Sequence, residues 1–154
     1  MENVLLSHEG LKQLDKFIED TKQSLNQVTD EKNWMFEYDT NTWHDNFPYE
    51  ELTRRKFELE TELENFEKSR KAARIIEKHG KAGIVDIDDI VMLKCEDEKF
   101  SVRLTGNYIA DIAAEDITNI TLNSPMQIFR KKIGDKIFAG SNCYIIMDIK
   151  KDKV

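Results

Sequence analysis

Two runs of hydrophobic residues with helical spacing, separated by a short helix-breaking stretch, constrain the fold of this chain more than any other feature. In residues 11–38 the hydrophobic positions recur three and four residues apart, and no proline or glycine interrupts them. Residues 39–48 are rich in Asp, Asn and Thr, which compete with the helix backbone for hydrogen bonds. A second run then extends to Ile76. Two such seams joined by a short turn predict two helices that fold back as an antiparallel coiled coil.

The ends of the predicted hairpin are marked by residues suited to helix termini. Ser7 is a good N-cap, and Gly80 suits a left-handed C-cap. About 30 residues at ~1.5 Å each give an arm of roughly 45 Å. Residues 80–154 cannot cover such an arm, so we expect it to project toward a partner. We therefore predict a hairpin in residues 1–79, with its tip near residues 37–51.

The second half of the chain has the pattern of a small α+β domain. Short β-branched and aromatic runs predict strands, and Ser124-Pro125 predicts a short helix through about Lys131. The predicted strands are residues 84–93, 100–104, 117–122, 136–139 and 144–149. The overall fold class is therefore α+β, with a helical hairpin in residues 1–79 followed by a second domain in residues 80–154.

Charge and hydropathy exclude several classes of protein. The net charge is −7, whereas a protein that binds duplex nucleic acid through phosphate contacts is normally basic. No apolar run approaches the roughly 20 residues that cross a bilayer. The two cysteines lie among apolar neighbours without zinc-site spacing, which favours reduced, buried thiols. We expect a cytoplasmic protein that does not contact a membrane.

The predicted tip is acidic and aromatic. From Asn33 to Thr53 there is no Lys or Arg, while Asp39 and Asp45 lie among tryptophan, phenylalanine and tyrosine. The tip is either a solvated loop whose aromatic side chains close the hairpin, or a set of carboxylates that helps hold Mg²⁺. So exposed a site lacks the dry, preorganised surroundings of a catalytic centre, and a partner would have to complete it.

Several segments together resemble the Gre-type bacterial transcript cleavage factors, the GreA and GreB family. The resemblance covers nearly the whole chain and is loose at residues 106–111. It is carried by Leu6-Ser7-His8-Glu9-Gly10-Leu11-Lys12-Gln13-Leu14, by Asp45-Asn46-Phe47-Pro48-Tyr49, by Leu122-Asn123-Ser124-Pro125 and by Lys132-Ile133-Gly134-Asp135. Its most specific part is the Asn-Ser-Pro segment together with the later Gly-Asp.

The resemblance implies a concrete function. An FKBP-like C-terminal domain would dock on bacterial RNA polymerase, with Asn123, Ser124 and Pro125 as partner-binding residues. The hairpin would enter the secondary channel, where Asp45 and Asp39 would act as the catalytic, metal-binding carboxylates for a Mg²⁺ shared with the polymerase. Asn46 and Tyr49 would support the tip.

In such a complex the factor is not an enzyme by itself. It stimulates the polymerase's own cleavage of backtracked RNA, and it meets the nascent RNA 3′ end indirectly. The resemblance therefore implies a transcription elongation factor with Mg²⁺ bound only in the complex. We expect a monomer, because the hydrophobic seam is satisfied within the hairpin.

The tip departs from the family pattern. Asp45 stands where the family has Glu, and Thr42 stands where the family typically has an Asp. Phe47 and Pro48 replace the usual Ala and Glu. Three hypotheses follow: a cleavage-stimulating elongation factor, a regulator or inhibitor that occupies the channel without cleavage, and a coiled-coil adaptor or peptide-binding module unrelated to transcription.

Overall fold

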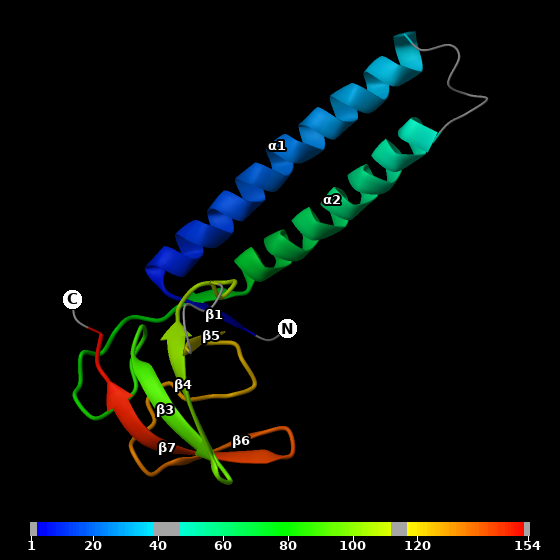
Figure 1. The fold of residues 1–154 in the computed structure, drawn as a ribbon. Helices are drawn as coiled ribbons and strands as arrows, with labels where there is room; N and C mark the ends of the chain where they lie inside the picture. The colour runs from blue at the N-terminus through cyan, green and yellow to red at the C-terminus, as the bar shows by residue number, and fades with distance from the viewer. Residues whose placement is uncertain (1–2, 39–46, 112–116, 153–154) are drawn as a thin grey trace. The chain divides into compact units, whose positions relative to one another are not determined.

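The computed structural model describes residues 3–38, 47–111 and 117–152, and its fold class is α+β, as predicted (Figure 1). Its elements, in chain order, are β1 (Val4–Leu6), α1 (His8–Tyr38), α2 (Phe47–Lys71), β2 (Ala73–Ile75), β3 (Ile90–Cys95), β4 (Glu98–Thr105), β5 (Ile117–Thr121), β6 (Lys136–Ala139) and β7 (Asn142–Lys150). The predicted turn at residues 39–48 lies mostly outside the described residues.

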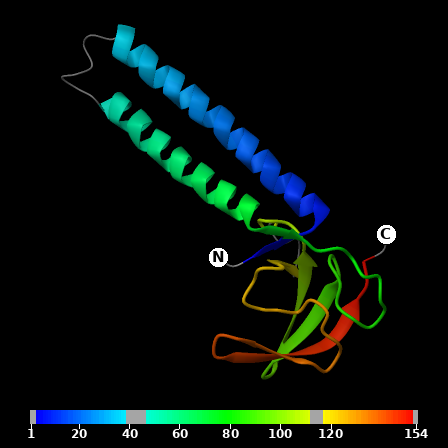
Figure 2. The same ribbon diagram turned by 180° about the vertical axis from the view of Figure 1, so that it is seen from behind.

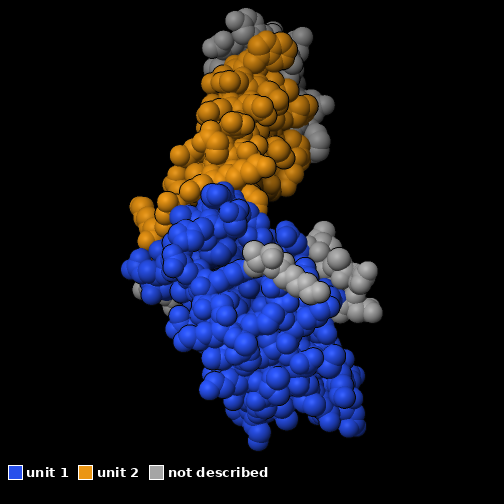
Figure 3. Space-filling view, turned by 90° about the vertical axis from the view of Figure 1, so that its left-hand side faces the viewer, with its two compact units in different colours: residues 1–13, 73–154 blue, residues 14–72 orange. Residues whose placement is uncertain are grey.

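The chain divides into two compact units, which differ from the two predicted domains (Figure 3). Unit 1 combines residues 1–13 with residues 73–154, and unit 2 is residues 14–72. The sequence analysis placed the boundary between residues 79 and 80 instead. The difference arises because β1 pairs in parallel with β2, with Val4 opposite Ala73, so both ends of the helical segment belong to unit 1.

In unit 2 the two helices lie side by side and run in opposite directions (Figures 1 and 2). Leu14, Thr21 and Val28 on α1 are buried and stand seven residues apart, in keeping with a hydrophobic seam. The Phe17 and Phe66 rings stack 5.7 Å apart between centroids. The supercoil of a coiled coil stays a prediction.

The helix α2 ends earlier than the sequence pattern predicts. Ala73 and Ile76 continue the helical spacing, yet Ala73 lies in β2 and the Ile76 N–H donates to the Leu6 carbonyl at 2.8 Å. Pairing with β1 therefore takes these residues out of the helix. Gly80 has the left-handed φ of 69° expected of a cap, but it follows β2 and caps no helix.

Unit 1 is built on a five-stranded curled, mixed sheet with strand order β5-β4-β3-β7-β6 (Figure 1). The β4–β5 pair is parallel and the other pairs are antiparallel. A bulge interrupts the β3–β7 pairing between Met92 and Leu93. The core consists of the buried residues Val85, Ile87, Val91, Leu93, Val102, Leu104, Leu122, Ile128, Ile137 and Ile146.

Two local predictions in unit 1 are wrong. The strand predicted at residues 84–93 begins only at Ile90, because Val85 and Ile87 reach the core from a turn in which Asp88 has a φ of 73°. The short helix predicted from Ser124 to Lys131 is absent from the described structure, which has turns and irregular backbone there. Ile128 in this segment and Leu122 just before it are both buried, and their spacing of six residues is not that of one helix face.

Candidate functional site

Of the four site residues predicted at the tip, only Tyr49 lies within the described structure. Asp39, Asp45 and Asn46 fall outside it, so their catalytic and metal-binding roles stay predictions. Tyr49 is in the first turn of α2, and the Lys32 ammonium lies 5.2 Å from its ring centroid. This distance is that of a cation–π contact, which joins α1 to α2 next to the predicted tip.

The described residues that flank the tip form a hollow in unit 2. Its volume is about 660 Å³. It is lined by Asp30, Glu31, Trp34, Met35, Pro48, Glu51 and Leu52. Apolar side chains and three carboxylates line this hollow. One of the carboxylates, Glu51, forms an ion pair with Arg54, with 2.7 Å between Glu51 Oε2 and a guanidinium nitrogen. Asp30, Glu31 and Trp34 precede the predicted tip, so the acidic and aromatic character of residues 37–51 extends to the residues before it.

Asn123, a predicted partner-binding residue, is fully engaged within unit 1. Its Oδ1 accepts the Leu5 N–H at 2.7 Å, and its Nδ2 donates to the Leu5 carbonyl at 2.9 Å. Ser124 Oγ accepts the Met126 N–H at 3.2 Å, and Pro125 is exposed. Asn123 thus fixes β1 beside the turn that follows β5, while the exposed Pro125 is accessible to a partner.

The opening motif, residues 6–14, contacts the segment 106–109. Ser7 Oγ accepts the Gly10 N–H at 3.0 Å, which makes Ser7 the predicted N-cap. The Ser7 N–H donates to the Gly106 carbonyl at 2.9 Å. Two segments that the sequence analysis connected only by resemblance are therefore neighbours in the structure.

Gln13 holds the same segment and was not singled out from the sequence. Its Oε1 accepts the Tyr108 N–H at 2.9 Å and the Ile109 N–H at 3.1 Å. Its Nε2 donates to the Ile109 carbonyl at 3.3 Å. A glutamine on a charged helix face gives no sequence signal for such a role, since its partners are backbone groups 95 and 96 positions away.

The motif at residues 132–135 is a tight turn that leads into β6. Asp135 Oδ2 accepts the Lys132 N–H at 2.8 Å, and the Asp135 N–H donates to the Lys132 carbonyl at 3.0 Å. Gly134 has a φ of 91°, in the region that favours glycine. Its N–H donates to the Ile146 carbonyl at 2.7 Å. Gly134 and Asp135 therefore shape the chain beside β7.

Two buried aspartates hold the turn before β3. Asp86 and Asp89 are 4% and 2% exposed. Burial raises the pKa of Asp86, but the N–H groups of Gly80, Ile87 and His79, helped by the nearby imidazole, outweigh it and lower that pKa below its usual value. Asp89 pairs with Lys151 at 2.8 Å. The Asp86 oxygens accept backbone N–H groups of the turn, while Asp89 ties the turn to Lys151 and to the Asp152 N–H at 3.1 Å, which indicates a structural role for both.

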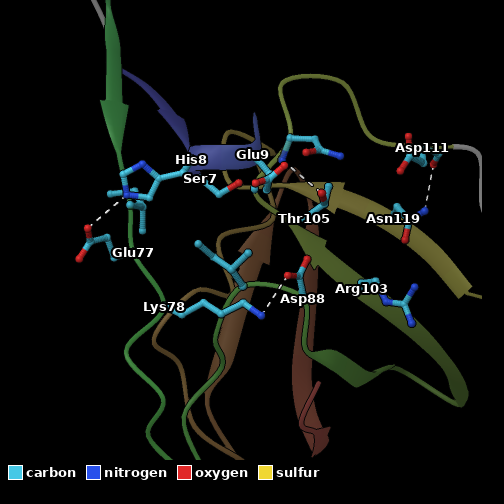
Figure 4. A pocket seen from close by; sticks show the side chains of 14 residues that line it. Ser7, His8, Glu9, Glu77, Lys78, Asp88, Arg103, Thr105, Asp111 and Asn119 are labelled. Atoms are coloured by element: carbon cyan, nitrogen blue, oxygen red, sulfur yellow. Dashed lines mark hydrogen bonds and ion pairs between the residues drawn. The ribbon is translucent and has the colours of Figure 1, made fainter. Parts of the chain in front are cut away.

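A polar cavity of about 590 Å³ lies in unit 1 (Figure 4). Most of its charged groups are paired with one another. His8 Nε2 is 3.2 Å from Glu77 Oε1, and Lys78 Nζ is 3.1 Å from Asp88 Oδ2. The remaining lining residues are Ser7, Glu9, Ile76, Ile87, Arg103, Thr105, Gly106, Asn107, Asp111 and Asn119.

Within residues 3–38, 47–111 and 117–152, no group of three or more His, Cys, Asp or Glu side chains is placed to hold a metal ion. The predicted Mg²⁺ site concerns Asp39 and Asp45, which lie outside these ranges. None of the helices in the described part of the chain is both long enough and apolar enough to cross a membrane.

Comparison with known proteins gives similarity at the level of structure. No protein-family model matches the chain, and no curated protein matches its sequence. The chain is similar to the crystal structure of the GreA factor homolog 1 (Gfh1) protein of Thermus thermophilus, with 19% identity and a TM-score of 0.48 over 97% of this chain and 100% of that one.

Two further structures give similar values. A structure of the transcription factor Gfh1 has 20% identity and a TM-score of 0.47, covering 97% of this chain and 99% of that one. Thermus aquaticus Gfh1 has 19% identity and a TM-score of 0.49, covering 98% and 100%. At these identities and TM-scores, the similarities assign neither a family nor an activity to the chain.

Proposed function

We propose that this chain is a transcription elongation factor that binds bacterial RNA polymerase and stimulates the cleavage of backtracked RNA. The helices of unit 2 form an antiparallel coiled coil that enters the secondary channel of the polymerase. Asp45, together with Asp39, helps hold a Mg²⁺ in the polymerase active site, and Asn46 and Tyr49 support them. The factor acts as a monomer in the cytoplasm, and by itself it is not an enzyme.

The observation that carries this proposal is the meeting of the Gre-like motifs. Residues 6–14 contact the loosely matching residues 106–109 through Ser7 and Gln13, and Asn123 bonds to Leu5, which directly precedes the motif at residues 6–14. If these motif resemblances had arisen by chance, we would not expect the matching segments to hydrogen-bond to one another or to residues beside them. These contacts therefore support a framework shared with the Gre-type factors, including an FKBP-like unit 1.

Unit 2 supports the same proposal through its charge. Its described end carries Asp30, Glu31 and Glu51 around an apolar hollow, and the predicted tip between α1 and α2 adds Asp39 and Asp45. An exposed carboxylate pair binds Mg²⁺ weakly, because most of the other ligands must come from water or from a partner. The polymerase, which has its own metal, supplies what the tip lacks.

The direct test is a transcript cleavage assay. Purified protein is added with Mg²⁺ to a stalled, backtracked elongation complex of a bacterial polymerase, and 3′-labelled RNA is followed over time. We expect release of short 3′ fragments, which is lost in Asp45→Asn. The matched control is Asp20→Asn, since Asp20 is an exposed carboxylate of α1 that forms no ion pair within the described residues. Full activity in Asp45→Asn would refute the role of Asp45.

The second candidate is a regulator or inhibitor that occupies the channel without stimulating cleavage. The observation in its favour is Thr42, which stands where the Gre-type factors typically have an Asp. This candidate predicts that the protein displaces a Gre-type factor from polymerase but releases no RNA fragment. Thr42→Asp should then introduce cleavage. If Thr42→Asp gains nothing, position 42 is not the reason for the inactivity.

A further inference from the structure

One face of the sheet in unit 1 is packed against the core, and the residues on the other face are exposed or half-buried. Leu93, Val102, Ile137 and Ile146 are buried in the core. Successive side chains of a strand point to opposite faces, so their neighbours point away from the core. Phe100 and Tyr144 also pack against the core. We call the following neighbours of these six residues, on the opposite side of the sheet, the outer face: Met92, Lys94, Lys99, Ser101, Arg103, Lys136, Phe138, Cys143 and Ile145. None of them is buried.

The strand register lines up three lysines on this outer face. Lys136 is opposite Ile145, Ile145 is opposite Lys94, and Lys94 is opposite Lys99. The row crosses β6, β7, β3 and β4, whose neighbouring strands lie about 4.8 Å apart. Like charges directly opposite each other on a sheet are destabilising, and the Lys94–Lys99 pair has this arrangement.

None of these three lysines is within ion-pair distance of a carboxylate in the described part of the chain, although other lysines there are paired. A chain with a net charge of −7 has many carboxylates with which to neutralise such a row. Glu96, Asp97 and Glu98 lie along the chain between Lys94 and Lys99, yet in the described structure none of them forms an ion pair with the row. The three ammonium groups therefore stay available to an acidic ligand.

Apolar side chains flank the lysine row on both sides. Phe138, opposite Cys143, is 72% exposed, and Met92, on the other side of the row, is 39% exposed. One acidic residue of β7, Asp148, also lies beside this row; it is opposite Met92 and accepts the Ile149 N–H at 2.9 Å. Exposed apolar side chains beside charged ones are found on protein docking surfaces.

We propose that the outer face binds an acidic segment of another protein. The carboxylates of this segment pair with Lys94, Lys99 and Lys136, and its apolar side chains pack on Phe138 and Ile145. A phosphate backbone would match the lysines and leave the apolar groups without partners, which favours a protein ligand. The surface shares no residue with the predicted tip or with Asn123–Pro125, so this inference is independent of the proposed function.

The test uses the full-length, ¹⁵N-labelled chain and three probes: a random copolymer of glutamate and tyrosine, polyglutamate, and single-stranded oligouridine. We expect saturable shifts of backbone amide signals on β3, β4, β6 and β7 with the copolymer. Polyglutamate should bind the same amides more weakly because it lacks aromatic groups. The double variant Lys94→Glu/Lys136→Glu should weaken binding about tenfold or more, since two surface ion pairs become repulsive.

The matched control is Lys16→Glu/Lys22→Glu, which makes the same change of charge at two exposed lysines of α1 that form no ion pair within the described residues. Phe138→Ala tests the apolar contribution, and its exposure makes a loss of folding unexpected. If Phe138→Ala binds the copolymer more weakly than the wild type does, and this difference remains at high salt, the apolar packing on Phe138 is supported.

Three results would overturn the proposal. The first is the absence of saturable shifts on these strands with the copolymer. The second is an equal loss of affinity in the Lys16→Glu/Lys22→Glu control, which would mean that overall charge governs binding. The third is oligouridine that binds the same amides at least as tightly as the copolymer, which would make the outer face a nucleic-acid surface.

Discussion

Replacing Gly10 with Ala tests the packing between the start of α1 and the segment 106–109. A Cβ atom added at Gly10 would lie 1.9 Å from the Gly106 carbonyl oxygen and 3.0 Å from the Asn107 Cα. Both are backbone atoms, which cannot rotate out of the way as a flexible side chain can. The contact is tight from both sides, because a Cβ at Gly106 would lie 2.4 Å from the Ser7 Cβ.

Two effects of opposite sign decide the outcome for Gly10→Ala. Ala is favoured over Gly inside a helix by about 1 kcal/mol, which alone would stabilise the protein. Against this, relieving the overlap must displace the segment 106–109 by more than an ångström. Overpacking of this kind costs about 1–3 kcal/mol, and weakening the Ser7 and Gln13 hydrogen bonds adds about 1 kcal/mol each. We expect a net destabilisation of about 2–4 kcal/mol.

Thermal unfolding followed by circular dichroism measures the effect. For a chain of this size, about 2–4 kcal/mol corresponds to a fall in Tm of about 4–16 °C. The control is Gln23→Ala, at an exposed position of the same helix, which should leave Tm nearly unchanged. A Gly10→Ala variant as stable as the wild type, or more stable, would show that helix propensity outweighs the contact and would refute the reasoning.

Three further substitutions test other parts of unit 1. Asn123→Ala removes both hydrogen bonds to Leu5 and should cost about 1–2 kcal/mol in urea unfolding, whereas Pro125→Ala, at an exposed residue, should leave stability unchanged. Because the pKa of Asp86 is lowered in the folded state, its stabilising contribution is present above about pH 4 and is lost as the pH falls through the folded pKa. Asp86→Asn should therefore flatten the acid limb of a plot of unfolding free energy against pH, and an unchanged limb would contradict this assignment. Ile146→Ala removes a fully buried side chain and should cost about 2–5 kcal/mol, so a loss under 1 kcal/mol would contradict its place in the core.

The long helices and most strands follow from local pattern. The three- and four-residue spacing in residues 11–38 predicted α1, because one buried stripe on a helix leaves that periodicity in the sequence. β4, β6 and β7 were predicted from alternating and β-branched runs. Ser7 was recognised as an N-cap from its residue type and position.

The features that the sequence analysis missed depend on long-range contacts. Ala73 and Ile76 fit a helical seam, yet pairing with β1 places them in and beside a parallel two-stranded sheet. The Ser-Pro pair at Ser124 predicted a helix start. In the structure, the side chains of Asn123 and Ser124 instead accept hydrogen bonds from the backbone N–H groups of Leu5 and Met126. No local pattern reports a partner as far along the chain as Val4 is from Ala73, or as Leu5 is from Asn123.

The functional residues show the same division. Asp39 and Asp45 were identified from an acidic, aromatic stretch together with a family resemblance, and both lie outside the described residues. Asn123 was identified by resemblance alone, and its contacts add a structural role that residue type did not reveal. The lysine row of Lys94, Lys99 and Lys136 is invisible in the sequence, because strand register brings the three residues together.

The central claim, that this chain binds bacterial RNA polymerase, is tested most directly by a binding measurement. Fluorescently labelled protein is titrated with purified core polymerase, and a Gre-type factor is then added as competitor. The account predicts saturable one-to-one binding that the competitor reverses and that Pro125→Ala weakens without a change in Tm. No binding at polymerase concentrations of tens of micromolar, with the protein folded, would contradict the claim.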